Sequence, residues 1–534
     1  MQPIDPNLET AHSFVVLGAS GRLATQKVFP ALWALYRDNR LPQGTRIFTY
    51  SRTKLHTRTY RLTCAPYMDL DPERDPQKFN SFWLTVHCVQ GQYDSPEDYA
   101  ALTEAMVLQE SKHNQIYANR IFYLALPPVV FDQVTLNLSR KCKSSTGCTR
   151  IVVEKPFARN DLTFRPYQTA LCQTFKESQI YMIDHFLSKQ ITQNVFGLRF
   201  ANHLWSETLN NSHVAAVMIT VKCEKPVKAR AEYFNFFGII RDVMTNHMMQ
   251  LLALVAMDKP YSNTIDDLRN ERLNLFKEVT TANMGDVVIG QYRNNRMESD
   301  PDKVGYTEHS YIPRDSATPT FAMVVLHINN RRWSGVPFIL RAGKAMNDTK
   351  TEVRIQYKSV GCDEGNSKDL DIRNELVLRL SPFEEIFMRL RLKQPGEELC
   401  LKEAALNLRV DDRNTKYMPN YNSLILDILK GNQSMFMRTD EQCEIWRIFS
   451  PILQRIDTDR PKPLPYDFGS RGPLLAYRKA ERVGFVFFTS DEWRENKETL
   501  DYTVKSSRIL SGPHHALKPD REPTVVKLRS TEIQ

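Results

Sequence analysis

Residues 181–189 read Tyr-Met-Ile-Asp-His-Phe-Leu-Ser-Lys and separate two parts of the chain with different patterns. Before them, short apolar runs alternate with helical patterns, which is typical of a nucleotide-binding α/β domain. After them, the alternation stops and longer strand-like runs follow. The apolar run ends in Asp184, His185 and Lys189, which predicts an acid, an imidazole and a cation at a sheet edge, where open α/β domains bind ligands. A plain structural role for this stretch is the alternative.

The composition indicates a globular protein of more than one domain. The chain has 534 residues, of which 42% are hydrophobic and 25% charged. The formal net charge is +9, but the basic residues are dispersed, which favours small phosphorylated ligands over nucleic acid as partners. The nine cysteines form no Cys-x-x-Cys pair and have no zinc spacing, so we expect a reduced intracellular protein without a metal site.

The two ends of the chain are polar. Residues 1–12 include Pro3 and Pro6 and do not resemble a signal peptide, and no apolar stretch is long enough to span a membrane. We therefore expect a soluble, cytoplasmic protein that does not contact membranes. Residues 512–534 are expected to form a loose tail.

A glycine-rich turn follows the first predicted strand at residues 13–17. Gly18, Ala19, Ser20 and Gly21 lead into a helix expected over residues 23–36, in which Ala24 is small enough for close packing against the strand. The glycines allow the backbone to approach a pyrophosphate, and the helix N-terminus offers N–H groups to it. The turn predicts a dinucleotide site, although similar turns also occur without ligands.

The end of the second predicted strand, at residues 46–50, indicates which dinucleotide is bound. An NAD enzyme carries an acidic residue at this place, whereas this chain has Ser51, Arg52 and Lys54. Hydroxyl, guanidinium and ammonium groups suit a 2′-phosphate, so the sequence favours NADP. A solvated basic loop is the alternative.

Further buried strands are predicted at residues 121–126 and 150–153. The second is followed by Glu154, Lys155 and Pro156, so that Lys155 is expected to reach into a ligand cleft; a cis bond before Pro156 is possible. The fold class expected for the first part is a Rossmann-type α/β domain over residues 1–183.

An α+β domain with a large, mostly antiparallel sheet is expected over residues 184–511. It has strand patterns at residues 214–221, 286–292, 320–328, 338–341, 351–356 and 375–380. A long apolar helix is predicted from about residue 236 to 257. Asp242 and Asn246 lie on one face of it, with His247 one step round the turn. A histidine in such a helix is either a core residue or a functional one.

Several of these segments resemble one family. From about residue 14 to residue 493 the chain is similar to glucose-6-phosphate dehydrogenases. The matching segments are Gly18-Ala19-Ser20-Gly21, 122–128, 153–157, Ile183-Asp184-His185, 238–247, 335–345, 374–377 and 469–473.

The resemblance implies an NADP-dependent oxidation of glucose 6-phosphate, the first step of the oxidative pentose phosphate pathway, in a homodimer or homotetramer. His247 would be the general base and Asp184 would orient it. The residues implied for the sugar phosphate are Lys155, His185, Lys189, Asp242, Lys344 and a carboxylate that falls at Glu224 if a one-residue shift is allowed. Those implied for NADP are Gly18, Ala19, Ser20, Gly21, Lys27, Arg52 and Lys155. A second, structural NADP site would comprise Arg341, Lys350, Arg354, Arg379, Arg389, Arg471 and Trp493.

The departures from the family pattern lie close to the chemistry. Phe186 replaces a tyrosine, Ser188 a glycine, and Cys223 occupies the carboxylate position when no gap is allowed. Each lost hydrogen bond to an anion costs on the order of 1.5–3 kcal/mol. The alternative function is therefore a divergent paralogue with weak or no activity and a structural, assembly or ligand-sensing role.

Overall fold

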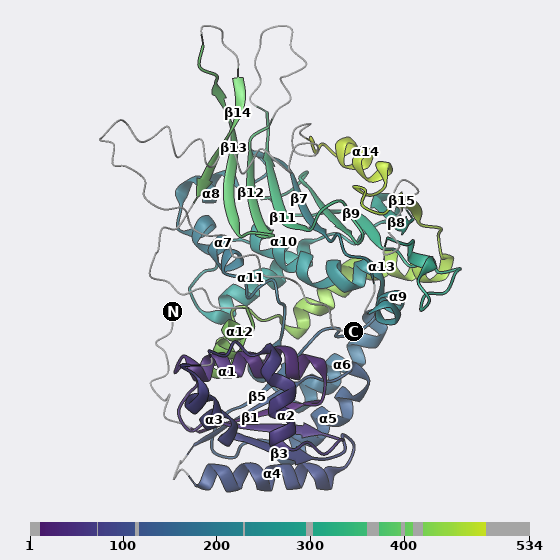
Figure 1. The fold of residues 1–534 in the computed structure, drawn as a ribbon. Helices are drawn as coiled ribbons and strands as arrows, with labels where there is room; N and C mark the ends of the chain where they lie inside the picture. The colour runs from purple at the N-terminus through teal and green to yellow at the C-terminus, as the bar shows by residue number, and fades with distance from the viewer. Residues whose placement is uncertain are drawn as a thin grey trace, which may run out of the picture. The chain divides into compact units, whose positions relative to one another are not determined.

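A computed structural model of the protein describes residues 11–71, 73–112, 117–227, 230–294, 303–359, 373–396, 401–408 and 420–487. Trp493 and the predicted tail at 512–534 lie outside these residues. Within them, the chain forms a parallel sheet followed by a large mixed sheet with helices on one face (Figure 1). The predicted boundary at residue 183 stays a prediction.

The first sheet has six parallel strands in the order β3-β2-β1-β4-β5-β6, which is the Rossmann order. The strands are β1 (Ala11–Leu17), β2 (Arg46–Ser51), β3 (Val86–Gln90), β4 (Ala118–Leu124), β5 (Thr149–Val153) and β6 (Ile180–Met182). Successive β1 residues such as Phe14, Val15 and Val16 are fully buried, because helices cover both faces of the sheet (Figure 1). The strands predicted around residues 13, 46, 121, 150 and 180 are confirmed, and β3 was not predicted.

The helices around this sheet follow the expected alternation with strands. A π-helical turn η1 (Ala24–Val28) continues into α1 (Phe29–Arg37), where the sequence predicted one helix. The others are α2 (Thr57–Cys64), α3 (Pro76–Leu84), α4 (Pro96–Ser111), α5 (Phe131–Asn137) and α6 (Asp161–Thr174).

A helix from late in the chain completes the core of the first sheet. Leu424, Ile425, Ile428 and Leu429 of α12 (Asn420–Lys430) are buried in the same cluster as Phe14, with α1 as a neighbour. This packing could not be predicted from the sequence, because an apolar helix face does not reveal which sheet it will cover.

The second sheet has nine strands within the described residues, in the order β14-β13-β12-β11-β7-β10-β9-β8-β15. β7 pairs with β10 and β8 with β15 in parallel, and the other pairs are antiparallel, so the predicted fold class is confirmed. The bounds are β7 (Val214–Lys222), β8 (Val287–Arg293), β9 (Phe321–His327), β10 (Pro337–Gly343), β11 (Lys350–Tyr357), β12 (Glu375–Ser381), β13 (Glu385–Lys393), β14 (Leu401–Leu408) and β15 (Leu464–Asp467). The sequence had not predicted the last three.

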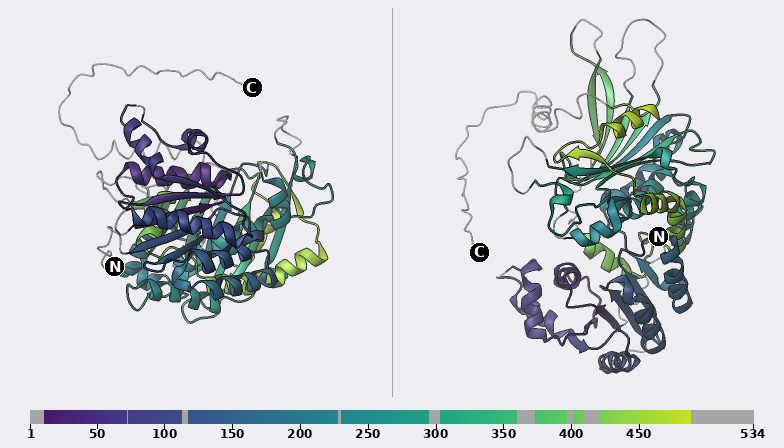
Figure 2. Two further views of the ribbon diagram at one scale, coloured as in Figure 1. Left: turned by 90° about the horizontal axis from the view of Figure 1, so that it is seen from below. Right: turned by 90° about the vertical axis from the view of Figure 1, so that its right-hand side faces the viewer.

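Helices cover one face of the large sheet, as Figure 2 shows from a second side. They include α7 (Gln190–Phe200), α10 (Met249–Ala256), α11 (Ile265–Glu278) and α13 (Thr439–Asp459); α8 (His203–Thr208), α9 (Ala231–Ile239) and α14 (Leu474–Arg482) lie towards its ends.

The predicted long helix over residues 236–257 is interrupted. Gly238 has φ +70°, which separates α9 from the π-helical segment η6 (Ile240–Met248), and α10 then continues to Ala256. A glycine is needed there, because other residues rarely adopt this conformation. Beyond the break, Ile239 donates its N–H to the carbonyl of Pro319 at 3.1 Å. The break fixes the start of the segment that carries His247.

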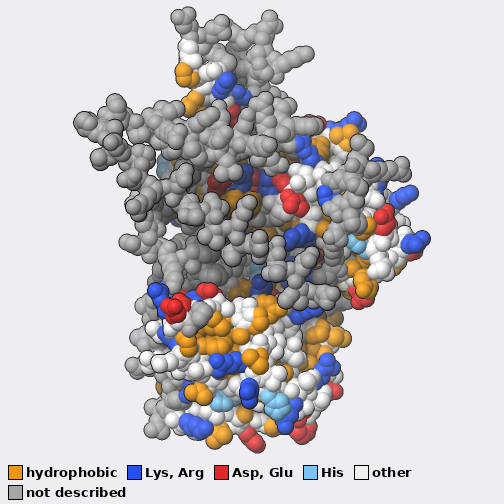
Figure 3. Space-filling model, viewed as in Figure 1, with side chains coloured by type: hydrophobic (Ala, Val, Ile, Leu, Met, Phe, Trp, Pro, Cys, Tyr) orange, Lys and Arg blue, Asp and Glu red, His pale blue; other side chains and the backbone are white. Residues whose placement is uncertain are grey.

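The surface carries mixed charge. On the face drawn in Figure 3, basic and acidic side chains of the described residues are interspersed and do not gather into one basic patch. No helix in the described part of the chain is long and apolar enough to cross a bilayer.

Replacement of Ile425 tests the role of α12. Because this side chain is fully buried, Ile425→Ala should lower the free energy of unfolding by about 2–5 kcal/mol, measured by urea titration. Leu426→Ala, at a partly buried position of the same helix, is the control and should cost less. Equal losses would contradict the proposed packing.

Candidate active site

Asp184 and His247 meet although they lie far apart in the chain. Asp184 follows the end of β6, and His247 lies in η6; Nδ1 of the imidazole is 2.7 Å from Oδ2 of the carboxylate. An ionised carboxylate only accepts hydrogen bonds, so Nδ1 carries the hydrogen and Nε2 is an acceptor. No group in the described residues hydrogen-bonds to Nε2. The imidazole is therefore prepared to take a proton from a substrate.

The surroundings of the pair fix its charge. Burial alone would raise the pKa of Asp184, but the charge and hydrogen bond of His247 and the N–H of Phe186 outweigh it and hold that pKa at about 2. Burial lowers the pKa of His247 below its ordinary value, against the opposing effect of Asp184. At neutral pH the pair is thus a carboxylate with a neutral imidazole, which is the form a general base requires.

Phe186 covers one face of the imidazole. The two rings are stacked, with centroids 4.4 Å apart and planes 14° from parallel. The backbone N–H of His247 donates to Oδ1 of Asn246 at 2.7 Å. The residue that departs from the family pattern therefore packs against the proposed base and helps to bury it.

His185 is held by a buried carboxylate that the sequence analysis did not single out as a site residue. Its Nε2 lies 3.3 Å from Oε2 of Glu154 and 3.4 Å from the hydroxyl of Tyr421, the first-turn residue of α12. Tyr123 donates its hydroxyl to Oε1 of Glu154 at 2.6 Å. Nδ1 of His185 is buried and has no hydrogen-bond partner in the described part of the chain. An anion placed beside Nδ1 would satisfy it.

Lys155 and Asp242, which the resemblance implies as two contacts to the sugar, lie together in the structure. The Lys155 ammonium donates to the carbonyl of Asp242 at 2.9 Å and lies 3.7 Å from its Oδ1. Burial lowers the pKa of Lys155, Asp242 and Asp184 oppose this, and Lys344 adds to the lowering. Lys344 is therefore close enough for its charge to be felt at this site. The Lys155–Pro156 peptide bond is cis.

Lys189 is the residue immediately before α7. Its ammonium lies 3.4 Å from Oε1 of Glu384 and 3.3 Å from the carbonyl of Leu380. Glu384 also accepts the N–H of Ile191 at 3.2 Å. A phosphate that used Lys189 would thus share it with a carboxylate or displace that carboxylate.

The structure does not bring Glu224 to the Asp184–His247 pair. Glu224 lies just after β7 and is exposed, and its backbone N–H donates to the hydroxyl of Thr349. Cys223, in the ungapped position, has its N–H and carbonyl bound to Gly343 and Met346. Within the described residues, neither Glu224 nor Cys223 makes a side-chain contact that would place it in the role of the family's sugar-binding carboxylate.

The glycine turn has the geometry that a dinucleotide needs. Gly18 has φ +80°, and a Cβ there would lie 2.4 Å from the carbonyl of Ala125. Gly21 donates its N–H to Gly18, and the hydroxyl of Tyr60 fixes the loop by donating to the carbonyl of Ala19 at 2.7 Å. Ser20 at the tip is exposed. These features fit a pyrophosphate close to the backbone.

Two predicted cationic contacts to the dinucleotide lie near this turn. Lys27 is exposed in the turn that precedes α1, and Arg52 is exposed at the end of β2. The guanidinium of Arg52 lies over the ring of Tyr93, 5.5 Å from its centre. Cation–π contact of this kind orients Arg52 at the place where a 2′-phosphate would sit.

Most of the residues expected for a second NADP gather on strands of the large sheet, and four of them, Lys350, Arg354, Arg379 and Arg389, have acidic partners. Arg354 makes a two-pronged salt bridge with Glu375 at 2.8–3.2 Å, and Arg379 lies 3.2 Å from Glu385. Arg341 donates to the hydroxyl of Tyr477 at 2.6 Å. The remaining members have these contacts: Arg389 lies 3.5 Å from Glu375, Lys350 lies 3.6 Å from Asp348, and Arg471 accepts from Arg341 through its carbonyl.

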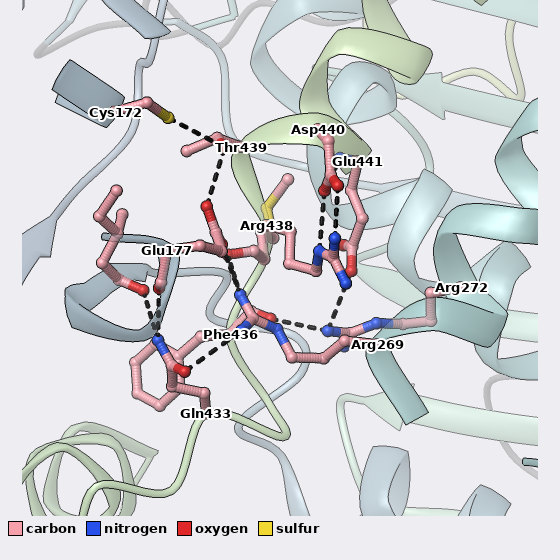
Figure 4. Close-up of polar contacts among 12 residues, drawn as sticks. Cys172, Glu177, Arg269, Arg272, Gln433, Phe436, Arg438, Thr439, Asp440 and Glu441 are labelled. Atoms are coloured by element: carbon pink, nitrogen blue, oxygen red, sulfur yellow. Dashed lines mark hydrogen bonds and ion pairs between the residues drawn. The ribbon is translucent and has the colours of Figure 1, made fainter. Parts of the chain in front are cut away.

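A buried polar network behind the site anchors β6 (Figure 4). Gln433 donates its amide to the carbonyls of Glu177 and Ile180 at 3.0 and 2.8 Å. Arg269 of α11 pairs with the Glu177 carboxylate at 2.8 Å, and Thr439 donates to the same carboxylate at 2.9 Å. The network thus joins α11 and the start of α13 to the strand whose end carries Asp184.

The sequence missed several residues of the site. Glu154 had a signal, since it stands beside Lys155 at the end of a predicted strand. Tyr421 and Glu384 had none, because each comes from a segment remote in sequence and only the folded chain brings it to His185 or Lys189.

Comparison with known proteins identifies the relatives of this chain. Family models for the NAD binding domain and the C-terminal domain of glucose-6-phosphate dehydrogenase match residues 15–194 and 196–494. Glucose-6-phosphate 1-dehydrogenase of Drosophila melanogaster is 43% identical over 91% of this chain and 92% of its own length. The enzyme of that name from Caenorhabditis elegans is 40% identical over 92% and 94%. A solved glucose-6-phosphate dehydrogenase in complex with its substrate glucose-6-phosphate has TM-score 0.84 and 34% identity, over 90% of this chain and 99% of that one. The resemblance read from the sequence is confirmed.

Acid titration tests the ionisation of Asp184. A carboxyl whose pKa is lowered in the folded state stabilises the fold above its ordinary pKa of 3.8, and this stability is lost as pH falls towards about 2. Carbon-13 NMR of the aspartate side chains should therefore show the Asp184 carboxyl still ionised at about pH 3, where an aspartate in an unfolded chain is largely protonated. Asp184→Asn should remove this signal, and the control Asp315→Asn, at a largely exposed side chain, should leave it. An Asp184 signal that titrates with the ordinary pKa of an aspartate would contradict the assignment.

Proposed function

Because this chain belongs to the glucose-6-phosphate dehydrogenase family, we propose that it oxidises glucose 6-phosphate to 6-phosphogluconolactone with hydride transfer to NADP. This reaction is the first step of the oxidative pentose phosphate pathway. The observation that carries the proposal is the 2.7 Å bond between His247 and Asp184, which leaves Nε2 of a neutral imidazole as an acceptor.

Nε2 of His247 takes the proton of the hydroxyl at the sugar's first carbon as that carbon loses a hydride. Bound NADP supplies the acceptor for the hydride. The imidazolium that forms is stabilised by the buried carboxylate of Asp184, which two backbone N–H groups already hold in place. Phe186 keeps water from one face of the ring.

We assign the phosphate of the sugar to His185 and Lys189, and the hydroxyl groups to Lys155, Asp242 and Lys344. The support is the buried, unpartnered Nδ1 of His185, the proximity of His185 to Asp184, and the proximity of Asp242, Asp184 and Lys344 to the ammonium of Lys155. Glu224, in the loop after β7, is a further proposed contact to the sugar.

Gly18, Ala19, Ser20 and Gly21 would hold the pyrophosphate, with Lys27 and Lys155 as further contacts and Arg52 at the 2′-phosphate. Support for NADP over NAD comes from the arginine over Tyr93 at the end of β2.

The strand cluster around Arg354 is the proposed second NADP site, with Arg341, Lys350, Arg379, Arg389, Arg471 and Trp493. Its support is the gathering of cations on neighbouring strands. A phosphate there has to compete with Glu375 for Arg354. A cytoplasmic homodimer or homotetramer, formed through the large sheet, completes the proposal by family analogy.

An absorbance assay of NADP reduction tests the activity. Wild type should turn over glucose 6-phosphate, and His247→Asn should lower kcat by about 10²–10⁴-fold, the usual contribution of a general base. His203→Asn, at an exposed histidine in α8, is the control and should leave kcat unchanged. No turnover by wild type at millimolar substrate would favour the non-catalytic paralogue instead.

A second assay tests the choice of dinucleotide. Arg52→Ala should raise KM for NADP by about ten- to hundredfold, as expected for one lost hydrogen bond to a phosphate, and leave KM for NAD nearly unchanged. Arg455→Ala, on the exposed side of α13, serves as control. An equal effect on both dinucleotides would show that Arg52 does not read the 2′-phosphate.

A further inference from the structure

A second pocket lies near the start of strand β5 in the first sheet, whereas the glycine turn lies at the carboxyl ends of the strands. It has a volume of about 290 Å³ and includes Thr149 and Arg150 at the start of β5 and Tyr181 in β6. Gly18 follows the end of β1, and the carboxyl ends of parallel strands share one edge. A ligand in this pocket therefore does not overlap the dinucleotide site, and its binding does not depend on the proposed activity.

The lining of the pocket is suited to an anion. It holds the cations Lys143 and Arg150 and the hydroxyl groups of Ser178 and Tyr181, and none of the residues that line it is an aspartate or glutamate. The hydroxyl of Tyr181 has no hydrogen-bond partner within the described ranges, although 99% of this residue is covered. Asp427 is the acidic residue that acts electrostatically on Tyr181, and its carboxyl group accepts a hydrogen bond from the side chain of Asn432 at 3.1 Å.

Arg150 is held in a fixed orientation. Its Nη1 donates to the carbonyls of Ile428 and Leu429 in the last turn of α12, at 2.8 and 2.9 Å. Nε and Nη2 make no hydrogen bond to any described residue, so one edge of the guanidinium is available. A guanidinium edge with two N–H groups matches the geometry of a phosphate or carboxylate.

Gly431 keeps the approach to that edge open. It has φ +74°, and a Cβ there would lie 2.9 Å from Nη2 of Arg150. Any other residue at this position would be strained and would crowd the guanidinium. The turn after α12 thus leaves the edge of Arg150 accessible from the pocket.

We propose that this pocket binds a small phosphate-bearing anion, with Arg150 gripping two oxygens and Tyr181 and Lys143 donating to the others. Lys143 already donates once, to the carbonyl of Thr174 at 2.5 Å, and its ammonium retains two further N–H groups. The volume suits a phosphate with a small organic group and is too small for a dinucleotide.

Alkylation of Cys148, which lines the pocket, tests the proposal with the full chain and inorganic phosphate as probe. Phosphate should slow the reaction of Cys148 with iodoacetamide, measured by peptide mass spectrometry, and leave the exposed Cys172 unaffected. Sodium chloride at the same ionic strength should protect neither cysteine.

Substitutions in the pocket test whether the protection of Cys148 comes from phosphate bound there. Tyr181→Phe removes only the unpartnered hydroxyl, and Lys143→Gln removes an exposed charge and one hydrogen bond to the carbonyl of Thr174. Both variants should fold, and each should raise the phosphate concentration for half-protection about tenfold. Lys141→Gln, an exposed neighbour outside the pocket, should match wild type. Protection that is absent, or unchanged in both variants, overturns the proposal. Crystals soaked in tungstate give an independent readout, since density beside Arg150 supports the site and its absence there at millimolar tungstate rejects it.

Discussion

The bond between His247 and Asp184 is the constraint on which the rest of the structure depends. Both groups are buried, and an isolated carboxylate in such a place would be strongly disfavoured. Its two backbone donors and the imidazole remove that penalty, but only if β6 and η6 are held at the correct separation. The chain therefore has to fix a strand of the first sheet against a helical segment that packs on the second.

Two sets of hydrogen bonds and ion pairs maintain the separation between β6 and η6. On the strand side, Gln433 and Arg269 tie the start of β6 to the segment before α13 (Figure 4). On the helix side, Arg241 of η6 pairs with Asp457 of α13 at 2.6 Å, and Gln442 donates to the carbonyl of Thr245 at 3.3 Å. The helix α13 thus contacts η6, which carries His247, and Glu177, which precedes the strand that leads to Asp184. This explains why a segment near the end of the described chain matters for a candidate site formed by residues 184 and 247.

The sequence predicted the parts of the site that stand at the ends of regular strands and missed those brought in by tertiary packing. Strand ends can be predicted from buried apolar runs, and such runs directly precede Asp184, His185 and Lys155. The break at Gly238 was not foreseen, because a glycine inside an apolar pattern is also compatible with an unbroken helix. Tyr421 was not foreseen either, since a tyrosine on an amphipathic helix gives no indication of a contact more than two hundred residues away.

The substitution at Phe186 can be understood from the same burial. A tyrosine at this position would offer a hydroxyl group to the proposed phosphate. The apolar ring of Phe186 instead stacks on His247 and contributes to the burial that lowers the pKa of the imidazole and keeps it neutral. In the proposed mechanism, the substitution weakens ground-state binding of the anion and favours the neutral form of the base. The proposed phosphate contact His185 is held in position by Glu154 and Tyr421, and Tyr421 lies in the first turn of the helix whose last turn orients Arg150. Helix α12 therefore joins the core of the first sheet, the proposed phosphate end of the active site and the proposed second anion pocket, so a shift of this one helix would affect all three.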